Sequence, residues 1–220
     1  MTYLEYAIYD LDNTEVEIKS NIELAIQQRV NVISVPFALT KFCKSLVKGT
    51  DILVSNAIDY PLGISDTKTR NSAISNAIDN GAQKIDLVLQ NNYLSLKKYD
   101  KLKQDIYSNL EICKKYNIEL CFYLEYRTFT HQSLIKACNM LYETGSINNV
   151  YVSTGHMLDN IDDNIIAVVL LKQKTNINTI FSGNIWTEQH VRTLVKNNIN
   201  HIRFNNIYSA ILYNKYLLST

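Results

Sequence analysis

The stretch VYVSTGH at residues 150–156 combines a strand pattern with side chains that can do chemistry. Its residues alternate between two faces, and Tyr151 and Ser153 share one of them before a turn at Gly155. If this strand belongs to a closed barrel, Tyr151 stands where catalytic groups usually stand. A phenol can donate a proton or a hydrogen bond to a carbonyl, although weakly unless its ordinary pKa of about 10 is perturbed. A tyrosine that merely fills space is the alternative.

Two carboxylates, Asp86 in KIDLVLQ and Glu125 in IELCFYLEY, lie on strand-like runs that follow each other. Two carboxylates that lie close together raise the pKa of one of them, which suits proton transfer near neutrality. A polar network without catalysis is the alternative. Lys84 shares a strand face with Asp86 but lies near the strand start, so we expect its ammonium to reach solvent. Arg127 and Arg203 are the expected counter-charges.

Metal and phosphatase chemistry have little support. Asp10 and Asp12 match the D-x-D-x-T spacing of a phosphatase signature, but an N-cap role for the following helix explains them better. No pair of histidines has metal-ligand spacing. We therefore predict no metal and no cofactor. The four histidines are His131, His156, His190 and His201.

The composition narrows the class of protein. The 220 residues carry 22 Lys plus Arg against 21 Asp plus Glu, without a basic stripe, so we expect no nucleic-acid partner. The four cysteines form no CxxC pair, which favours reduced, buried thiols. No signal pattern or membrane-length apolar run is present, so a cytoplasmic protein without a membrane partner is predicted.

Short apolar runs alternate with longer amphipathic runs along the whole chain, which predicts eight strands, each followed by a helix. Strands with branched apolar residues on both faces indicate a parallel sheet that is covered on both sides. The prediction is an α/β fold, a single (β/α)8 TIM barrel over residues 1–220. A doubly wound open sheet is the alternative, but its glycine-rich phosphate fingerprint is absent. The expected strands are 6–10, 30–35, 51–63, 84–90, 118–126, 150–156, 177–183 and 201–206.

The segment NAIDYPLGISDTKTRNSAISNAIDNGAQKIDLVLQ, followed by VSTG and then FSGNI, resembles the deoxyribose-phosphate aldolase family. These are class I aldolases of deoxynucleoside catabolism. The resemblance extends from about Tyr6 to Leu212 and is strongest from Asn56 to Val88. It implies a TIM barrel whose active site lies at the carboxyl ends of the strands.

The departures from the family pattern concern its two lysines. The resemblance places the Schiff-base lysine at Tyr151 and the second lysine, which tunes the first, at Ile180. It implies that the proton-transfer aspartate is kept as Asp86 and that the fifth-strand glutamate is Glu125. Because a phenol cannot condense with an aldehyde, imine formation is unavailable at Tyr151.

The resemblance also implies a phosphate cup after the last two strands, and this cup is altered. Gly155 and Gly183 remain, whereas Asn184 replaces a glycine and narrows access to the backbone. Ile207 and Tyr208 replace two serines. We expect that the free amides of the last helix could still bind an anion. Arg203 could substitute in part for the missing groups.

Three functional hypotheses follow from these residues. The first is a divergent aldolase-like protein that binds a small carbonyl or sugar-like metabolite, with any lyase or isomerase chemistry non-covalent through Tyr151, Asp86 and Glu125. The second is a catalytically silent homologue that acts as a binding or regulatory partner, as a homodimer or with an aldolase homologue. The third is an active aldolase with a relocated lysine. The predicted substrate-binding residues are Ser153, Thr154, Gly155, Ser182, Gly183, Arg203 and Asn205.

Overall fold

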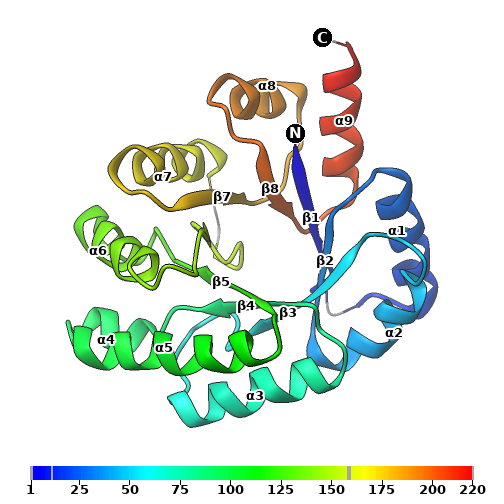
Figure 1. Ribbon diagram of the computed structural model, residues 1–220. Coiled ribbons are helices and arrows are strands. Elements are labelled where there is room, and N and C mark those ends of the chain that lie inside the picture. The colour runs from blue at the N-terminus through cyan, green and yellow to red at the C-terminus, as the bar shows by residue number, and fades with distance from the viewer. Residues whose placement is uncertain (1, 11, 158–159, 220) are drawn as a thin grey trace.

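Eight parallel strands close into one barrel in the order β1 to β8 in the computed structural model, which describes residues 2–10, 12–157 and 160–219. The helices surround the strands, which lie at the centre (Figure 1). The predicted (β/α)8 TIM barrel is therefore confirmed. The strands are β1 Tyr3–Ala7, β2 Val32–Val35, β3 Leu53–Ile58, β4 Lys84–Val88, β5 Glu119–Tyr123, β6 Asn149–Tyr151, β7 Asn178–Ser182 and β8 His201–Phe204.

The helices follow the strands as predicted, with two short additions that the sequence pattern did not show, η1 and α4. The first strand begins three residues earlier than predicted, which leaves Asp10 beyond its end. The helices are α1 Glu15–Gln27, η1 Phe37–Leu39, α2 Thr40–Leu46, α3 Thr67–Asp79, α4 Asn91–Ser95, α5 Tyr99–Lys115, α6 His131–Tyr142, α7 Ile161–Lys174, α8 Glu188–Lys196 and α9 Tyr208–Ser219.

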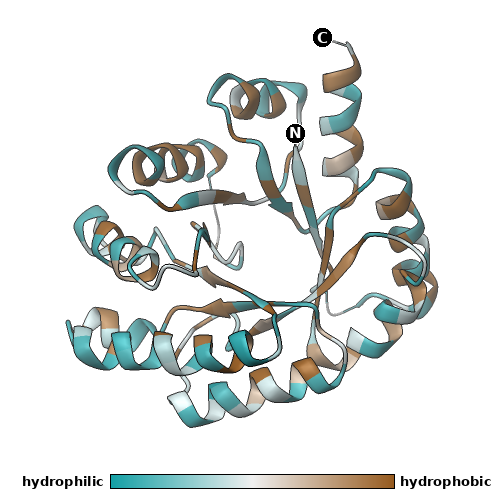
Figure 2. Ribbon diagram, in the orientation of Figure 1, coloured by the Kyte–Doolittle hydropathy of each residue, from teal (hydrophilic) through white to brown (hydrophobic). Residues whose placement is uncertain are grey.

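The core lies mainly between the strands and the helices that cover them. Helix α1 buries Ile18, Ile22 and Ala25 against the barrel, whereas Ile26 lies at the exposed edge of this face. Figure 2 shows apolar residues on the strands and mixed apolar and polar surfaces on the helices. The four cysteines are buried and free, as expected. No helix in the described part of the chain is long and apolar enough to cross a bilayer.

Side-chain caps fix the starts of α1 and α3. Thr14 caps α1 and forms a capping box with Glu17, so the N-cap prediction for Asp10 and Asp12 is wrong. A threonine directly before the first helical turn can reach the free N3 amide, which residues two or four positions earlier cannot. Asp66 caps α3, with its side chain accepting from the Thr69 amide.

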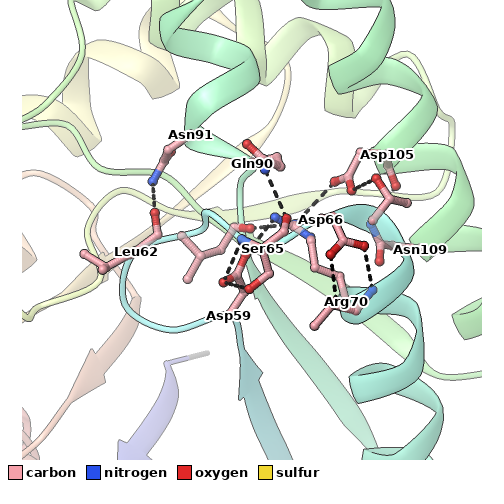
Figure 3. A network of polar contacts seen from close by, with 12 residues as sticks. Asp59, Leu62, Ser65, Asp66, Arg70, Gln90, Asn91, Asp105 and Asn109 are labelled. Atoms are coloured by element: carbon pink, nitrogen blue, oxygen red, sulfur yellow. Dashed lines mark hydrogen bonds and ion pairs between the residues drawn. The ribbon is translucent and has the colours of Figure 1, made fainter.

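The loop between β3 and α3 is held by a buried arginine (Figure 3). The Arg70 guanidinium lies 3.2 Å from Asp59 Oδ2, donates to the Val88 carbonyl at 2.7 Å and lies 3.3 Å from Asp105 Oδ2. This one side chain therefore joins the loop to the end of β4 and to α5. The loop carries Tyr60, whose hydroxyl donates to the Thr154 carbonyl at 2.8 Å.

Candidate functional site

A buried ionic network occupies the barrel interior. The Lys84 ammonium donates to Glu5 Oε1 at 2.8 Å and to the Tyr151 hydroxyl at 2.6 Å, and it lies 3.4 Å from Asp86 Oδ1. The Tyr151 hydroxyl also bonds Glu5 Oε2 and lies 3.0 Å from Asp86 Oδ1. A phenol has one proton, so it can donate to only one of these carboxylates at a time. Strands β1, β4 and β6 thus meet through four polar side chains.

The prediction that Lys84 reaches solvent is wrong. Lys84 is 1% exposed, and it is paired in register with Ser55 of β3 and with Glu119 of β5. Lys84 and Asp86 point to the same side of a pleated strand, and that side is the inside of the barrel. The ammonium is therefore the main counter-charge of Asp86, and Arg203, one of the two expected counter-charges, contributes beside it.

The network fixes the charge state of its members. Burial opposes ionisation of Glu5, but the Lys84 ammonium and the His201 hydrogen bond outweigh it and hold the pKa of Glu5 below its usual range. Burial also lowers the pKa of Lys84, yet Asp86 and Glu5 raise it well above the ordinary value. The pKa of Asp86 is raised by burial, and Lys84 only partly offsets this. Lys84 is thus held as an ammonium.

Tyr151 points into the barrel, as the alternation of its strand indicated. Its ring stacks on Tyr123 with centroids 4.3 Å apart, and its side chain is fully buried. Burial, followed by the charges of Asp86 and Glu5, raises the pKa of the Tyr151 phenol well above 10. The Tyr151 phenol is thus a neutral hydrogen-bonding group. Another pair of stacked rings, those of Tyr9 and Tyr60, has centroids 5.0 Å apart.

Asp86 and Glu125 do not face each other. Asp86 is in register with Cys121, four residues before Glu125 on the next strand. Four residues of strand span about 13 Å, so the two carboxylates lie in different layers. Glu125 Oε2 instead accepts from the Thr154 hydroxyl at 2.8 Å. The close carboxylate neighbour of the Lys84–Asp86 pair is Glu5, on β1.

The predicted substrate-binding residues after β6, β7 and β8 do converge. A Cβ placed on Gly155 would lie 3.7 to 3.8 Å from Asn205 Nδ2, Ser182 Oγ and Arg203 Nη1. Arg203 Nη1 donates to Ser182 at 3.1 Å and to Asn205 Oδ1 at 3.2 Å. The Gly183 amide donates to the Arg203 carbonyl at 2.9 Å. The turn predicted at Gly155 has φ of 73°, and its amide donates to Ser153 Oγ at 2.9 Å.

Arg203 is fully buried, with its guanidinium 5.6 Å from the Tyr9 ring centroid and 5.2 Å from that of Tyr123. Its Nε and Nη2 atoms make no hydrogen bond to the described residues. With Lys84 it balances the two interior carboxylates, Glu5 and Asp86. The interior is therefore close to neutral when all four groups are ionised.

A cavity of about 390 Å³ lies above the ends of β6, β7 and β8. Its lining combines polar and aromatic side chains at the carboxyl ends of the strands, where TIM-barrel sites are found. Among the lining residues are Gly155, His156, Asn184, Trp186, His190 and Asn205.

The amides expected to be free at this cavity are partly occupied. Asn184 Oδ1 accepts from the backbone amides of Asn205 and Asn206 at 2.9 and 3.0 Å. Asn206 Oδ1 accepts from the Tyr208 amide at 2.9 Å, at the start of α9. The expectation of free amides there is wrong for these three groups, because asparagine carboxamides already cap them.

Sequence reasoning missed Glu5 and His201. His201 Nε2 lies 2.7 Å from Glu5 Oε1 and links the network to the amino-terminal face of the barrel. Strand alternation placed Lys84 beside Asp86, but no local pattern pairs β1 with β4. In residues 2–10, 12–157 and 160–219, no three His, Cys, Asp or Glu side chains group as a metal site would require.

The chain is similar in sequence to proteins named deoxyribose-phosphate aldolase. It is 31% identical to deoxyribose-phosphate aldolase 1 of Mesoplasma florum over 153 residues. This aligned segment covers 70% of this chain and 68% of that protein. The chain belongs to the deoxyribose-phosphate aldolase family. The family relative of Mycoplasma capricolum is 28% identical over 177 residues, or 80% of this chain and 78% of the relative. No protein-family model matches the sequence.

A solved structure carries the same fold. The deoxyribose-phosphate aldolase of Aeropyrum pernix, whose structure is described as tetrameric, superposes with a TM-score of 0.83 at 16% identity, covering 98% of this chain and 89% of that one. At this identity the likeness shows the fold alone. The aldolase-family prediction is confirmed by the sequence relatives.

Proposed function

We propose that this member of the deoxyribose-phosphate aldolase family binds a small carbonyl or sugar-like metabolite at the barrel mouth without forming an imine. The observation that supports this most is the Tyr151 phenol, buried against Lys84, Glu5 and Asp86, at the position that the family resemblance gives to the Schiff-base lysine. A phenol has no amine to condense with a carbonyl. Any lyase or isomerase chemistry would then be non-covalent.

In this proposal Asp86 and Tyr151 transfer protons to and from the ligand. Glu125 lies at the barrel mouth and accepts a hydrogen bond from the Thr154 hydroxyl, through which it would assist. The convergence of Gly155, Ser182 and Asn205 supplies the polar wall that orients the ligand. The residues at the ends of β6, β7 and β8 bind the ligand, and the buried side chains of Asp86 and Tyr151 lie deeper in the barrel.

Binding without turnover is a second candidate function, as a regulatory or partner protein. It is favoured by the burial of Asp86 and Tyr151, neither of which is exposed. Exchanging Asp86→Asn and Tyr151→Phe separates the two candidates in turnover assays on any sugar that stabilises the protein thermally. Loss of turnover in both variants supports proton transfer, whereas binding with no turnover in any variant supports the silent homologue.

An active aldolase that uses Lys84 is the third candidate, because its ammonium lies 3.4 Å from Asp86. An imine requires the free amine, and the raised pKa of Lys84 keeps it protonated. We expect borohydride reduction in the presence of acetaldehyde or 2-deoxyribose 5-phosphate to leave the intact mass unchanged. A reduced adduct that is present in the wild type and absent from Lys84→Met would contradict the proposal and identify the nucleophile. Lys101→Met, at an exposed position on α5, is the matched control.

A further inference from the structure

Backbone amides near the cavity donate to side-chain oxygens of the protein itself. Amides at the end of β8 and the start of α9 would form an anion site if they were free. Here Asn184 Oδ1 accepts two of them, at 2.9 and 3.0 Å, and Asn206 Oδ1 accepts a third. The orientation of the Asn184 carboxamide is fixed, because only its oxygen can face two N–H groups. A neutral oxygen thus occupies the place where an anionic oxygen would bind.

The other polar side chains that line the cavity are carboxamides and imidazoles. The NH2 groups of Asn184 and Asn205 make no hydrogen bond to the described residues and are available as donors. His190 Nδ1 accepts from the Trp186 amide at 3.2 Å. The buried Arg203 guanidinium donates to Ser182 Oγ and Asn205 Oδ1 and is not among the residues that line the cavity. The described lining of the cavity thus contains carboxamide donors but no lysine or arginine side chain.

Trp186 adds an aromatic wall to this cavity. Its side chain is 63% exposed on the loop between β7 and α8, and it is the only tryptophan of the chain. An indole face carries partial negative charge and attracts polarised C–H groups. An aromatic face beside carboxamide donors suits a ring that has C–H groups on one side and hydroxyls at its edge.

From these contacts we propose that the cavity after β6, β7 and β8 binds an uncharged sugar or polyol, and that Asn184 excludes the phosphorylated form. This inference rests on the proposed function, because it names the ligand class of the same barrel mouth. The excluded group is the phosphate, whose oxygens would have to displace the Asn184 carboxamide from the amides of Asn205 and Asn206.

Intrinsic fluorescence tests the inference, because the sole tryptophan reports on this cavity. Titration of the wild type with millimolar 2-deoxyribose is expected to change the Trp186 emission. We expect the protein to bind 2-deoxyribose more tightly than 2-deoxyribose 5-phosphate. Calorimetry gives the two affinities independently. Tighter binding of the phosphate ester would overturn the inference and leave the proposed function standing. Binding of neither compound would overturn both.

Removing the Asn184 carboxamide gives a gain-of-function test. Asn184→Ala uncaps the amides of Asn205 and Asn206, and we expect at least about tenfold tighter binding of 2-deoxyribose 5-phosphate. Asn184→Asp is the matched control, because its carboxylate keeps the amides capped and repels phosphate. An unchanged phosphate affinity in a folded Asn184→Ala protein would overturn the role of Asn184. If that variant does not fold, the wild-type comparison still decides the inference.

Discussion

At the scale of single residues, the barrel interior is organised around Lys84. A buried charge is tolerated only when it is paired and hydrogen-bonded, and this ammonium has Glu5, Asp86 and the Tyr151 hydroxyl within 3.4 Å. His201 completes the coordination of Glu5 from the other side. Each of these groups depends on the others, because the loss of one leaves an uncompensated neighbour.

Exchange of Lys84→Met is expected to lower the free energy of unfolding at pH 7 by about 3–5 kcal/mol, because it leaves Glu5 and Asp86 buried without their counter-charge. Urea denaturation measures this change. The exposed Lys101→Met is expected to stay within about 0.5 kcal/mol of the wild type. A Lys84→Met protein as stable as its control would mean that the ion pairs contribute nothing net.

The decrease in the free energy of unfolding caused by Lys84→Met is expected to become smaller as the pH falls. In the wild type the lowered pKa of Glu5 gives stability that is present above its unfolded pKa of about 4.3 and is lost below it. In the variant, Glu5 and Asp86 lose the ammonium that lowers their pKa values, so we expect burial to raise both and protonation to relieve the cost of burying them. The two stability curves therefore converge towards pH 4. A difference that is constant between pH 7 and pH 4 would contradict this account.

At the scale of elements, the loop between β3 and α3 is positioned by Arg70. Its planar guanidinium meets Asp59, the Val88 carbonyl and Asp105, which lie on three different elements (Figure 3). The loop so fixed carries Tyr60 across the mouth to the Thr154 carbonyl. Packing of α3 is thereby linked to the aromatic cover of the interior.

Exchange of Arg70→Lys is expected to destabilise the protein by about 1–3 kcal/mol, although the charge is kept. A single ammonium cannot satisfy three separated acceptors in the way that a fork of donors can. Chemical denaturation of this variant, beside Arg192→Lys at an exposed site of α8, checks the expectation. Equal stability of the two variants would show that the geometry of the guanidinium is dispensable.

At the scale of the whole molecule, closure of the sheet between β8 and β1 makes every strand depend on two neighbours. Glu5 and Lys84 are 79 positions apart in sequence and reach each other only across the closed barrel. We propose that residues 1–220 form one cooperative domain, as the uninterrupted strand–helix order predicts.

One domain predicts one unfolding transition. Far-UV circular dichroism follows all helices, whereas Trp186 emission follows the loop between β7 and α8. The two signals are expected to give the same urea midpoint, because local unfolding of that quarter of the barrel would open the sheet. Midpoints that differ beyond experimental error would indicate separate folding units.

The sequence by itself determined the strand and helix order and the family, and the family resemblance predicts a phenol at the position of a lysine. Periodicity reports which side of an element faces the core, and the motifs after β6 and β7 are local. The tertiary structure alone decided that Lys84 lies inside with Glu5, that Glu125 is a layer away from Asp86, and that Asn184 caps the amides after β8. These contacts join segments far apart in the chain. They depend on strand register and barrel closure, which alternation along one strand does not specify.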